Sequence, residues 1–487
     1  MEIFEKSVRK SSSTMFGRQE IAIPYKENEL TSEIITEILP FALKAHFVNM
    51  QDIRYLKSYT KGKQTILSKT KKVRPDINNI VVENNAYHVV EFKKGYVFGD
   101  PIQYVQRSEA SEDELSKLNS FMLENDKSSK DKDLAEDMYI SGVGYRIVLP
   151  SSDEDKPFVL DNLNNENTFV IYSTDIHRTP LMACYIMQRL DNMEIMCYTK
   201  NNVIYYDSNM KNKRTRETEV KLKKIEVNPL GQIPIFEYRL NKNRLGVIEL
   251  IMSQLDTLNK ITSSDIDDIE QFIQSLLVFI NQDIEKEKFT DMVELGALML
   301  SDTIGSQLRA DVKLLSQKLE HSETKILYTR IYENMLTIAG VPKMSDRSSG
   351  GDTGQARLVG EGWIMADERA KQDELAFKVS ERKMLRLVLD ICKVKRNSGI
   401  KQLKASDLEI KFTRNKSDNL LVKTQALMNL MNSQVSPDVA FGVVGLFSDP
   451  AEVVKQSKNY FGETFWKKEE VAQEAINSAV EVIEPIE

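Results

Sequence analysis

The sequence predicts an α+β fold in which a sheet-bearing region is followed by long helices. Three observations predict it. Residues 143–238 contain short β-branched and aromatic runs, residues from 247 onward repeat their apolar positions at helical spacing, and residues 355–395 form a long charged helical pattern. The chain has 487 residues, enough for about two to four units with separate cores. Its apolar runs are far shorter than the roughly 20 residues of a membrane span, so no membrane partner is expected.

The composition restricts the classes of function. The formal net charge is −7, whereas domains that grip nucleic acid through phosphate neutralisation are usually strongly basic. A protein through which nucleic acid slides remains possible. Cys184, Cys197 and Cys392 are too few and too scattered for a disulfide framework or a zinc cluster. The four histidines lie far apart, so we expect no metal, no cofactor and no catalytic triad.

The first part of the chain alternates helical and irregular segments, and no apolar signal core precedes them. We therefore expect the protein to be made and kept in a cytoplasm. The expected elements are a helix over 29–47, an exposed Lys-rich link over 57–74, a helical or mixed stretch over 77–97, a turn at 99–101, a strand at 102–105 and a polar helical region over 111–138 that breaks at 125–130.

The central part predicts one sheet and then a long helix. The expected strands are 145–149, 168–172, 183–187, 194–198, 203–206 and, after a sharp stop at 228–234, 235–238. A helix over 247–277 would be roughly 45 Å long, which is more than a core needs. A small mixed insertion should follow, with a strand at 277–280, a helix over 289–295 and strands at 298–300 and 312–315.

A second helix, over 321–339, should end at a polar loop. Gly340 predicts a left-handed C-cap and Pro342 prevents the helix from continuing, while the Ser, Gly, Asp and Thr residues that follow bury little apolar surface. Beyond the loop we expect the long helix over 355–395, a strand at 408–412 and several short helices over 419–487.

These segments and their local motifs resemble the portal proteins of tailed bacteriophages, most of all those of long-tailed phages that infect Gram-positive bacteria. The resemblance covers nearly the whole chain. Its motifs are a Tyr-x-x-Gly-x-Pro turn at 96–101, a small-residue step at 141–145, a Pro-x-Phe strand end at 232–237, helix signatures at 255–260 and 264–270, and loop borders at 341–345 and 354–357.

The resemblance implies the portal fold, with an α/β wing, a helical stem, a small α/β clip and a helical crown, assembled as a ring. It implies these boundaries: wing 1–245, stem helix 246–278, clip 279–319, second stem helix 320–340, tunnel loop 341–354, long wing helix 355–400, wing strand return 401–418 and crown 419–487.

The implied function is that of a conduit and not of an enzyme. A ring, usually of twelve subunits, would occupy one vertex of the capsid, where it nucleates procapsid assembly with the major capsid and scaffold proteins. Double-stranded DNA would pass through it during packaging and ejection. The clip would dock the large terminase subunit and later a head-completion adaptor, with the ring assembled in the host bacterial cytoplasm and retained in the virion.

The resemblance also assigns site residues. An acidic stem would let DNA slide because like charges repel over a Debye length of about 8 Å. Its expected channel-lining residues are Asp256, Asp265, Asp267, Asp268 and Glu270. The tunnel-loop residues are Lys343, Ser345, Asp346, Arg347, Ser348, Ser349, Asp352 and Thr353. The expected partner-docking residues of the clip are Asp283, Glu285, Lys286, Lys288, Asp302 and Arg309.

An alternative interpretation is a magnesium-dependent nuclease. Asp76 after a proline, then Glu91 and Lys93, have the spacing of a PD-(D/E)xK motif, in which two carboxylates bind Mg²⁺ and the lysine polarises the reacting groups. A non-viral ring scaffold is a third interpretation. The nuclease predicts Mg²⁺-dependent DNA cutting that Glu91→Ala abolishes, whereas a portal shows none.

Overall fold

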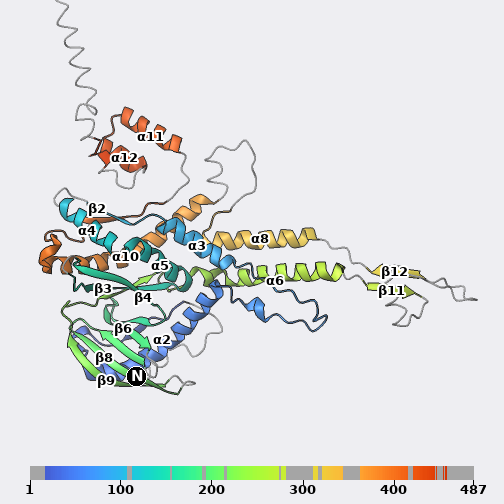
Figure 1. The fold of residues 1–487 in the computed structure, drawn as a ribbon, viewed down its shortest axis with the longest axis horizontal. Coiled ribbons are helices and arrows are strands. Elements are labelled where there is room, and N and C mark those ends of the chain that lie inside the picture. Colours follow the sequence, from blue (N-terminus) through green and yellow to red (C-terminus); the bar gives the residue numbers. More distant parts are fainter. Residues whose placement is uncertain are drawn as a thin grey trace, which may run out of the picture.

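The computed structural model describes residues 17–106, 112–153, 156–188, 193–212, 217–273, 276–280, 311–315, 321–343, 362–414, 420–444, 446, 453–454 and 456–457. A body of helices and sheets carries a projecting hairpin of two long helices, α6 (Val247–Ile273) and α8 (His321–Ala339) (Figure 1). The predicted mixture of sheet and long helix is therefore confirmed.

The strands of the body form two main sheets where the sequence predicted one. The six-stranded sheet has the order β1-β5-β6-β7-β8-β9, with β1 parallel to β5 and the other neighbours antiparallel. The second sheet is antiparallel, with the order β10-β3-β4. The strands are β1 (Ile21–Ile23), β3 (Val143–Pro150), β4 (Phe158–Leu163), β5 (Thr168–Ser173), β6 (Pro180–Gln188), β7 (Met193–Tyr198), β8 (Asn202–Asn212), β9 (Glu217–Val227) and β10 (Ile235–Arg239).

Three of these strands, β1, β4 and β9, were not predicted. Strand β1 has only three residues, and β9 lies at an edge of its sheet, where lysine and glutamate side chains outnumber apolar ones. Leu222 and Val227 of β9 are exposed, so this strand lacks the alternation of buried apolar and exposed polar residues that would have predicted it.

Helix α2 (Ser32–Thr60) packs against the six-stranded sheet. Its buried residues Leu39 and Leu43 share a core with Ile171 and Ile195 of the sheet. The helix does not end at 47 as predicted. Tyr59 is still fully buried one residue before its end, so the apolar period continues into the segment expected to be an exposed link.

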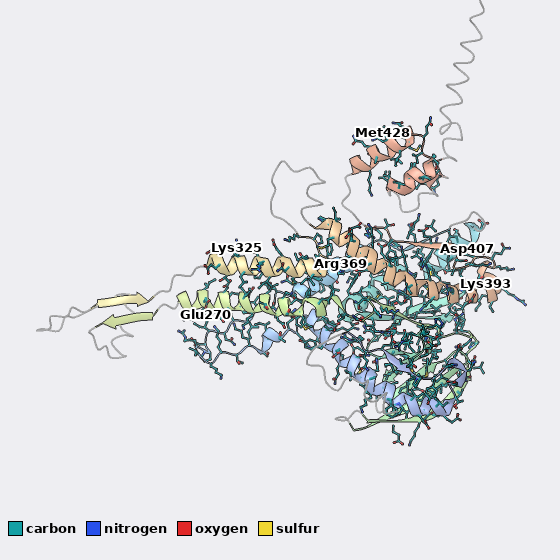
Figure 2. The ribbon with its side chains drawn as sticks, turned by 180° about the vertical axis from the view of Figure 1, so that it is seen from behind. Glu270, Lys325, Arg369, Lys393, Asp407 and Met428 are labelled. Carbon is teal, nitrogen blue, oxygen red and sulfur yellow. The ribbon has the colours of Figure 1, made fainter. Side chains whose placement is uncertain are left out.

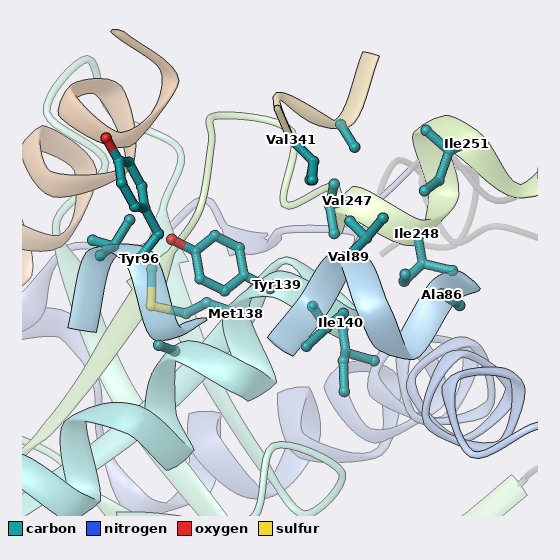
Figure 3. Close-up of a cluster of buried hydrophobic side chains, with 14 of the residues drawn as sticks. Ala86, Val89, Tyr96, Met138, Tyr139, Ile140, Val247, Ile248, Ile251 and Val341 are labelled. Atoms are coloured by element: carbon teal, nitrogen blue, oxygen red, sulfur yellow. The ribbon is translucent and has the colours of Figure 1, made fainter. Parts of the chain in front are cut away.

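A second core lies where the hairpin leaves the body. It joins α6 and α8 to α3 (Asn85–Phe98), α5 (Lys127–Ser141) and the first half of α10 (Trp363–Val394). Figure 3 shows Val89 of α3 beside Val247 and Ile248 of α6. The predicted break over 125–130 is shorter in the structure, because α5 already begins at Lys127.

The remaining elements complete the body and the outer end of the hairpin. Helix α4 (Glu112–Glu124), the second half of α10 and the strand pair β2 (Gln103–Gln106) and β13 (Leu408–Lys411) share a third core. Strands β11 (Leu276–Ile280) and β12 (Asp311–Leu315) pair at the outer end of the hairpin, and α11 (Leu420–Asn432) packs on α12 (Pro437–Val444).

The predicted end of the stem helix is wrong. The helix expected to reach 277 ends at Ile273, because Leu276 and Leu277 pair with β12 instead. Helix α10 ends at Val394, one residue before its predicted end, and a 3-10 turn follows. The predicted helix over 289–295 and strand at 298–300 lie outside the described residues.

Cys184 and Cys197 are not scattered in the fold, although they are separated in the sequence. They face each other across β6 and β7 with 3.1 Å between their Sγ atoms, and burial raises the pKa of the Cys184 thiol. Both are free cysteines inside the core. None of the described helices combines the length and the apolar character that a bilayer crossing requires.

A cluster of buried charges ties the second sheet to α5 and α10. The guanidinium of Arg146 lies 2.7 Å from Asp131, and the ammonium of Lys127 lies 2.9 Å from Glu381. The hydroxyl of Tyr238 donates to Glu381 at 2.6 Å. Burial alone would raise the pKa of Glu381, but Lys127 and Arg146 lower it below its usual value. The body therefore holds ionised groups that only their mutual pairing can stabilise.

Candidate functional site

The direction of α6 is set at its first turn, where the chain leaves the body. A Cβ atom on Gly246 would lie 2.1 Å from the carbonyl oxygen of Ile140, so only glycine allows this approach. The carboxylate of Glu249 accepts from the Gly246 amide at 2.8 Å and from Arg18 at 2.6 Å. Burial raises the pKa of Glu249, and Arg18 opposes that shift. The hairpin is thus anchored rigidly to the body.

One face of α6 carries a row of polar side chains that bind an extended segment of the same chain. Asn259, Ser263 and Asp267, which we call the polar ladder, accept hydrogen bonds from the backbone amides of Glu83, Val81 and Asn79 at 3.0, 3.0 and 2.6 Å. Four residues of helix rise about 6 Å, and two residues of extended chain rise about 6.6 Å. The two repeats therefore match, and residues 79–83 run antiparallel along α6.

Asp267 ends this ladder as a buried, doubly paired carboxylate. Its side chain is 1% exposed, and the ammonium groups of Lys69 and Lys71 each lie 2.6 Å from Oδ2. Burial alone would raise the pKa of Asp267, but the two lysines and Asn79 hold it far below its usual value. Asp267 thus carries a negative charge that its own subunit neutralises.

The other four predicted stem acids differ in their surroundings. Asp256 accepts from the hydroxyl of Tyr59 at 2.7 Å, and Glu270 accepts from the Asn79 amide side chain at 2.6 Å. Asp265 is half-buried and Asp268 is exposed. The structure therefore brings Asp256, Asp267 and Glu270 together with the 59–79 segment, whereas Asp268 faces solvent. Their place in the wall of a channel stays a prediction.

The apolar stripe of α6 changes its role along the helix. Ile248, Ile251, Leu255 and Leu258 are buried within the chain itself, so this half of the stripe stabilises the fold of the single chain. Further out the hairpin exposes apolar side chains. They are Ile266 (37%) and Ile269 (43%) of α6 and Ile326 (69%) and Leu327 (49%) of α8. Figure 2 places Glu270 and Lys325 on this part of the hairpin.

The residues at the start of the predicted loop form defined hydrogen bonds with the end of α8. Gly340 has φ +71°, and the amides of Gly340 and Val341 donate to the carbonyls of Thr337 and Leu336 at 3.2 and 2.9 Å. This is a Schellman ending, which confirms the predicted C-cap. Lys343 lies 2.9 Å from Glu333 of α8, so its charge is paired within the chain.

The other predicted site residues cannot be placed. The tunnel-loop residues Ser345, Asp346, Arg347, Ser348, Ser349, Asp352 and Thr353 lie outside the described residues, as do the clip residues Asp283, Glu285, Lys286, Lys288, Asp302 and Arg309. The roles predicted for them remain predictions.

The nuclease interpretation is wrong. Glu91 and Lys93 lie in helix α3, where residues two apart do not face each other, and not on a strand. Lys93 is buried 3.1 Å from Asp373 and donates to the carbonyl of Ala339 at the end of α8. Glu91 pairs with Lys94 instead, and Asp76 pairs with Arg74. Each residue of the motif thus has a structural partner.

Sequence analysis missed the polar ladder and its partner segment. The signal was present, since Asn259, Ser263 and Asp267 are spaced four residues apart beside an apolar stripe. No pattern in the sequence revealed the partner segment, because residues 79–83 show neither helical nor strand periodicity. Among the described residues, no group of three or more His, Cys, Asp or Glu side chains could hold a metal ion.

Comparison with known proteins gives a family match and a distant likeness among solved structures. Among solved structures, one chain titled "Neck of native GTA particle computed with C12 symmetry" has a TM-score of 0.37 and 12% identity, with coverage of 74% of this chain and 89% of that one. That likeness is too weak to establish a fold. No curated protein matches the sequence. The sequence profile of one family, "Phage portal protein, SPP1 Gp6-like", matches residues 41–460. Because this match spans most of the chain, the protein belongs to the phage portal protein family of the SPP1 Gp6-like type.

Proposed function

We propose that copies of this chain close into a ring, of twelve subunits as the resemblance implies, at a single capsid vertex and that α6 and α8 form its stem. The observation that carries the proposal is the row of exposed isoleucines on the outer hairpin. Ile269 and Ile326 lie exposed on the projecting hairpin, where none of the described residues covers them. Neighbouring hairpins in a ring would bury them, at about 1.5 to 3 kcal/mol for each side chain.

In this ring the stem would form a DNA channel with a weakly repulsive wall. Asp265 and Asp268 are the best candidates for the wall, because no described cation lies within ion-pair distance of either and Asp268 is exposed. Asp267 is a poor candidate, since Lys69 and Lys71 neutralise it. A duplex would then slide past a like-charged surface without sticking.

The tunnel loop would contact the DNA inside the ring. Its borders support this role, because the Schellman ending of α8 and the start of α10 hold both ends of the loop in place. Shortening residues 343–353 should leave ring assembly intact while DNA packaging or retention is impaired. Equal lengths of packaged DNA in mutant and parent particles would contradict this role.

The segment between β11 and β12 would be the clip, which docks the large terminase subunit and then a head-completion adaptor. The position of the β11–β12 pair at the outer end of the hairpin supports this assignment. Charge reversal at Lys286 and Lys288 should weaken terminase binding and leave the ring unchanged. The matched control is reversal of Arg396, an exposed cation of the body that belongs neither to the hairpin nor to the clip.

Electron microscopy and native mass spectrometry of the purified protein test the central proposal. Closed rings with a hole wide enough for a DNA duplex are expected. A monodisperse monomer at high protein concentration would overturn the ring, and with it the channel and the wall.

A further inference from the structure

The body has a charged surface that none of the roles above uses. A hollow of about 570 Å³ lies between the second half of α10 and the chain that leads into β13, and we call it the basic hollow. Its residues include four exposed cations, Arg382, Arg386, Lys393 and Lys404. Figure 2 shows Lys393 and Asp407 together at this end of the molecule, far from the hairpin.

The positive charge of the hollow is largely uncompensated. Asp390 is the acid that lines it, and Asp390 is already engaged by Lys393 at 3.7 Å and by Gln232 at 3.1 Å. Asp407, next to the hollow, accepts from the backbone amide of Lys404 at 3.2 Å. Among the described residues, no acid lies within ion-pair distance of Arg382, Arg386 or Lys404.

The crowding of cations extends to the neighbouring turn of α10. The pKa of Lys383 is lowered, first by partial desolvation and then by the positive charges of Arg239 and Arg386. Binding of an anionic ligand would relieve the repulsion between these cations.

Charged groups dominate the accessible lining of the hollow. Leu389 and Leu408 also line it, but they are almost fully buried, and Ala405 is half-buried. An acidic segment therefore complements the hollow through its charge.

This chain contains such a peptide. Residues 469–487 hold six glutamates and no lysine or arginine, and Glu481 and Glu484 alternate there with Val480, Val482 and Ile483. About 25 residues separate α12 from this segment, enough to span up to roughly 80 Å when extended. We propose that the acidic segment 469–487 of this chain, from the same or a neighbouring copy, docks in the basic hollow. This docking is independent of DNA passage.

Peptide binding tests the proposal directly. A fluorescent peptide with the sequence 469–487 is titrated into full-size assemblies that lack those residues, and anisotropy is measured. Binding that weakens at high salt is expected, because exposed charges are screened. The double variant R382E/R386E should weaken it about tenfold or more, and the neutral variant R386Q should weaken it less. The matched control R396E reverses an exposed cation outside the hollow and should leave binding unchanged.

Crosslinking of the complete chain provides the second measurement. A photoreactive residue at Ser406, on the hollow, should crosslink to residues 469–487, and R382E/R386E should reduce the product about tenfold or more. Changing Glu481 and Glu484 to lysine in the R382E/R386E background should restore it. Crosslinks to other segments, peptide binding unaffected by R382E/R386E, equal binding of a peptide with all six glutamates changed to glutamine, or tighter binding of duplex DNA would each overturn the proposal.

Discussion

The body and the hairpin differ in the kind of side chain that they bury and expose. In the body, charged groups such as Arg146 and Glu381 are fully buried and pair with one another. On the outer hairpin, apolar groups such as Ile326 and Ile269 are exposed. A buried charge is tolerated where it is paired, and here its partners belong to the same chain. In the ring proposed above, neighbouring copies would cover the exposed apolar row of the hairpin.

The largest effect should come from breaking the buried charge cluster. Glu381→Ala leaves Lys127 and Arg146 buried without their carboxylate, so the free energy of unfolding should fall by about 3 to 5 kcal/mol. Urea unfolding followed by circular dichroism measures it. Glu368→Ala, at an exposed position of the same helix, should change the free energy by about 0.5 kcal/mol or less. Equal effects of the two variants would show that the cluster does not stabilise the body.

A substitution on the outer hairpin should affect ring assembly and leave the folding of the single chain unchanged. Ile326→Glu places a carboxylate where we expect a neighbouring hairpin, at a loss of about 1.5 to 3 kcal/mol for each contact. Native mass spectrometry should show fewer closed rings, while the melting temperature of the dilute monomer stays the same. Lys325→Gln, on the adjacent residue, should assemble normally. A melting temperature that falls with Ile326→Glu would mean that Ile326 serves the fold of its own chain.

A buried histidine of the body provides a pH test. His46 donates from Nε2 to the carbonyl of Glu166 at 2.8 Å, and burial lowers its pKa from 6.5 to about 4. The unfolded chain therefore binds one more proton than the folded chain between these values, so stability falls as the pH is lowered through this window. From pH 7.5 to pH 5 the loss should be about 2 kcal/mol.

The variant His46→Gln isolates this contribution, because glutamine can donate the same hydrogen bond without titrating. Its unfolding free energy should depend less on pH between 7.5 and 5 than that of the parent protein. Parallel pH profiles of the two proteins would show that His46 is not the responsible group.

The most local effect should be seen at the polar ladder, which lies between the two regions. Asp267→Asn removes the charge that Lys69 and Lys71 share, so the amides of Asn79 and Val81 should exchange faster with deuterium. Asp268→Asn, the exposed neighbour, should leave exchange unchanged.

The ladder should also resist mild acid. Because the folded pKa of Asp267 is lowered, its stabilising effect is present above its ordinary pKa of 3.8 and is lost only as the pH falls below that value. Protection of Asn79 at pH 5 is therefore expected to equal that at pH 7. Loss of protection already at pH 5 would contradict the pairing.

Local signals in the sequence were sufficient for several elements. Helix α6 was predicted from its apolar spacing, the end of α8 from Gly340 and Pro342, and strand β13 from its alternating residues. In each case the signal lies within one turn or one strand, where backbone preference and side-chain burial act together. The same locality explains the failure at β9, whose edge position leaves its residues exposed.

The sequence alone thus determined most of the succession of helices and strands and the family likeness, because both depend on short-range patterns. Only the tertiary structure decided which acidic side chains of α6 are paired with lysines and which face solvent. Asp267 and Asp268 are neighbours of the same type in one acidic run, yet α6 turns the first toward Lys69 and Lys71 and the second toward solvent. The physical reason is that a helix rotates successive side chains by about 100°, and the segments that meet each face come from nearly 200 residues away.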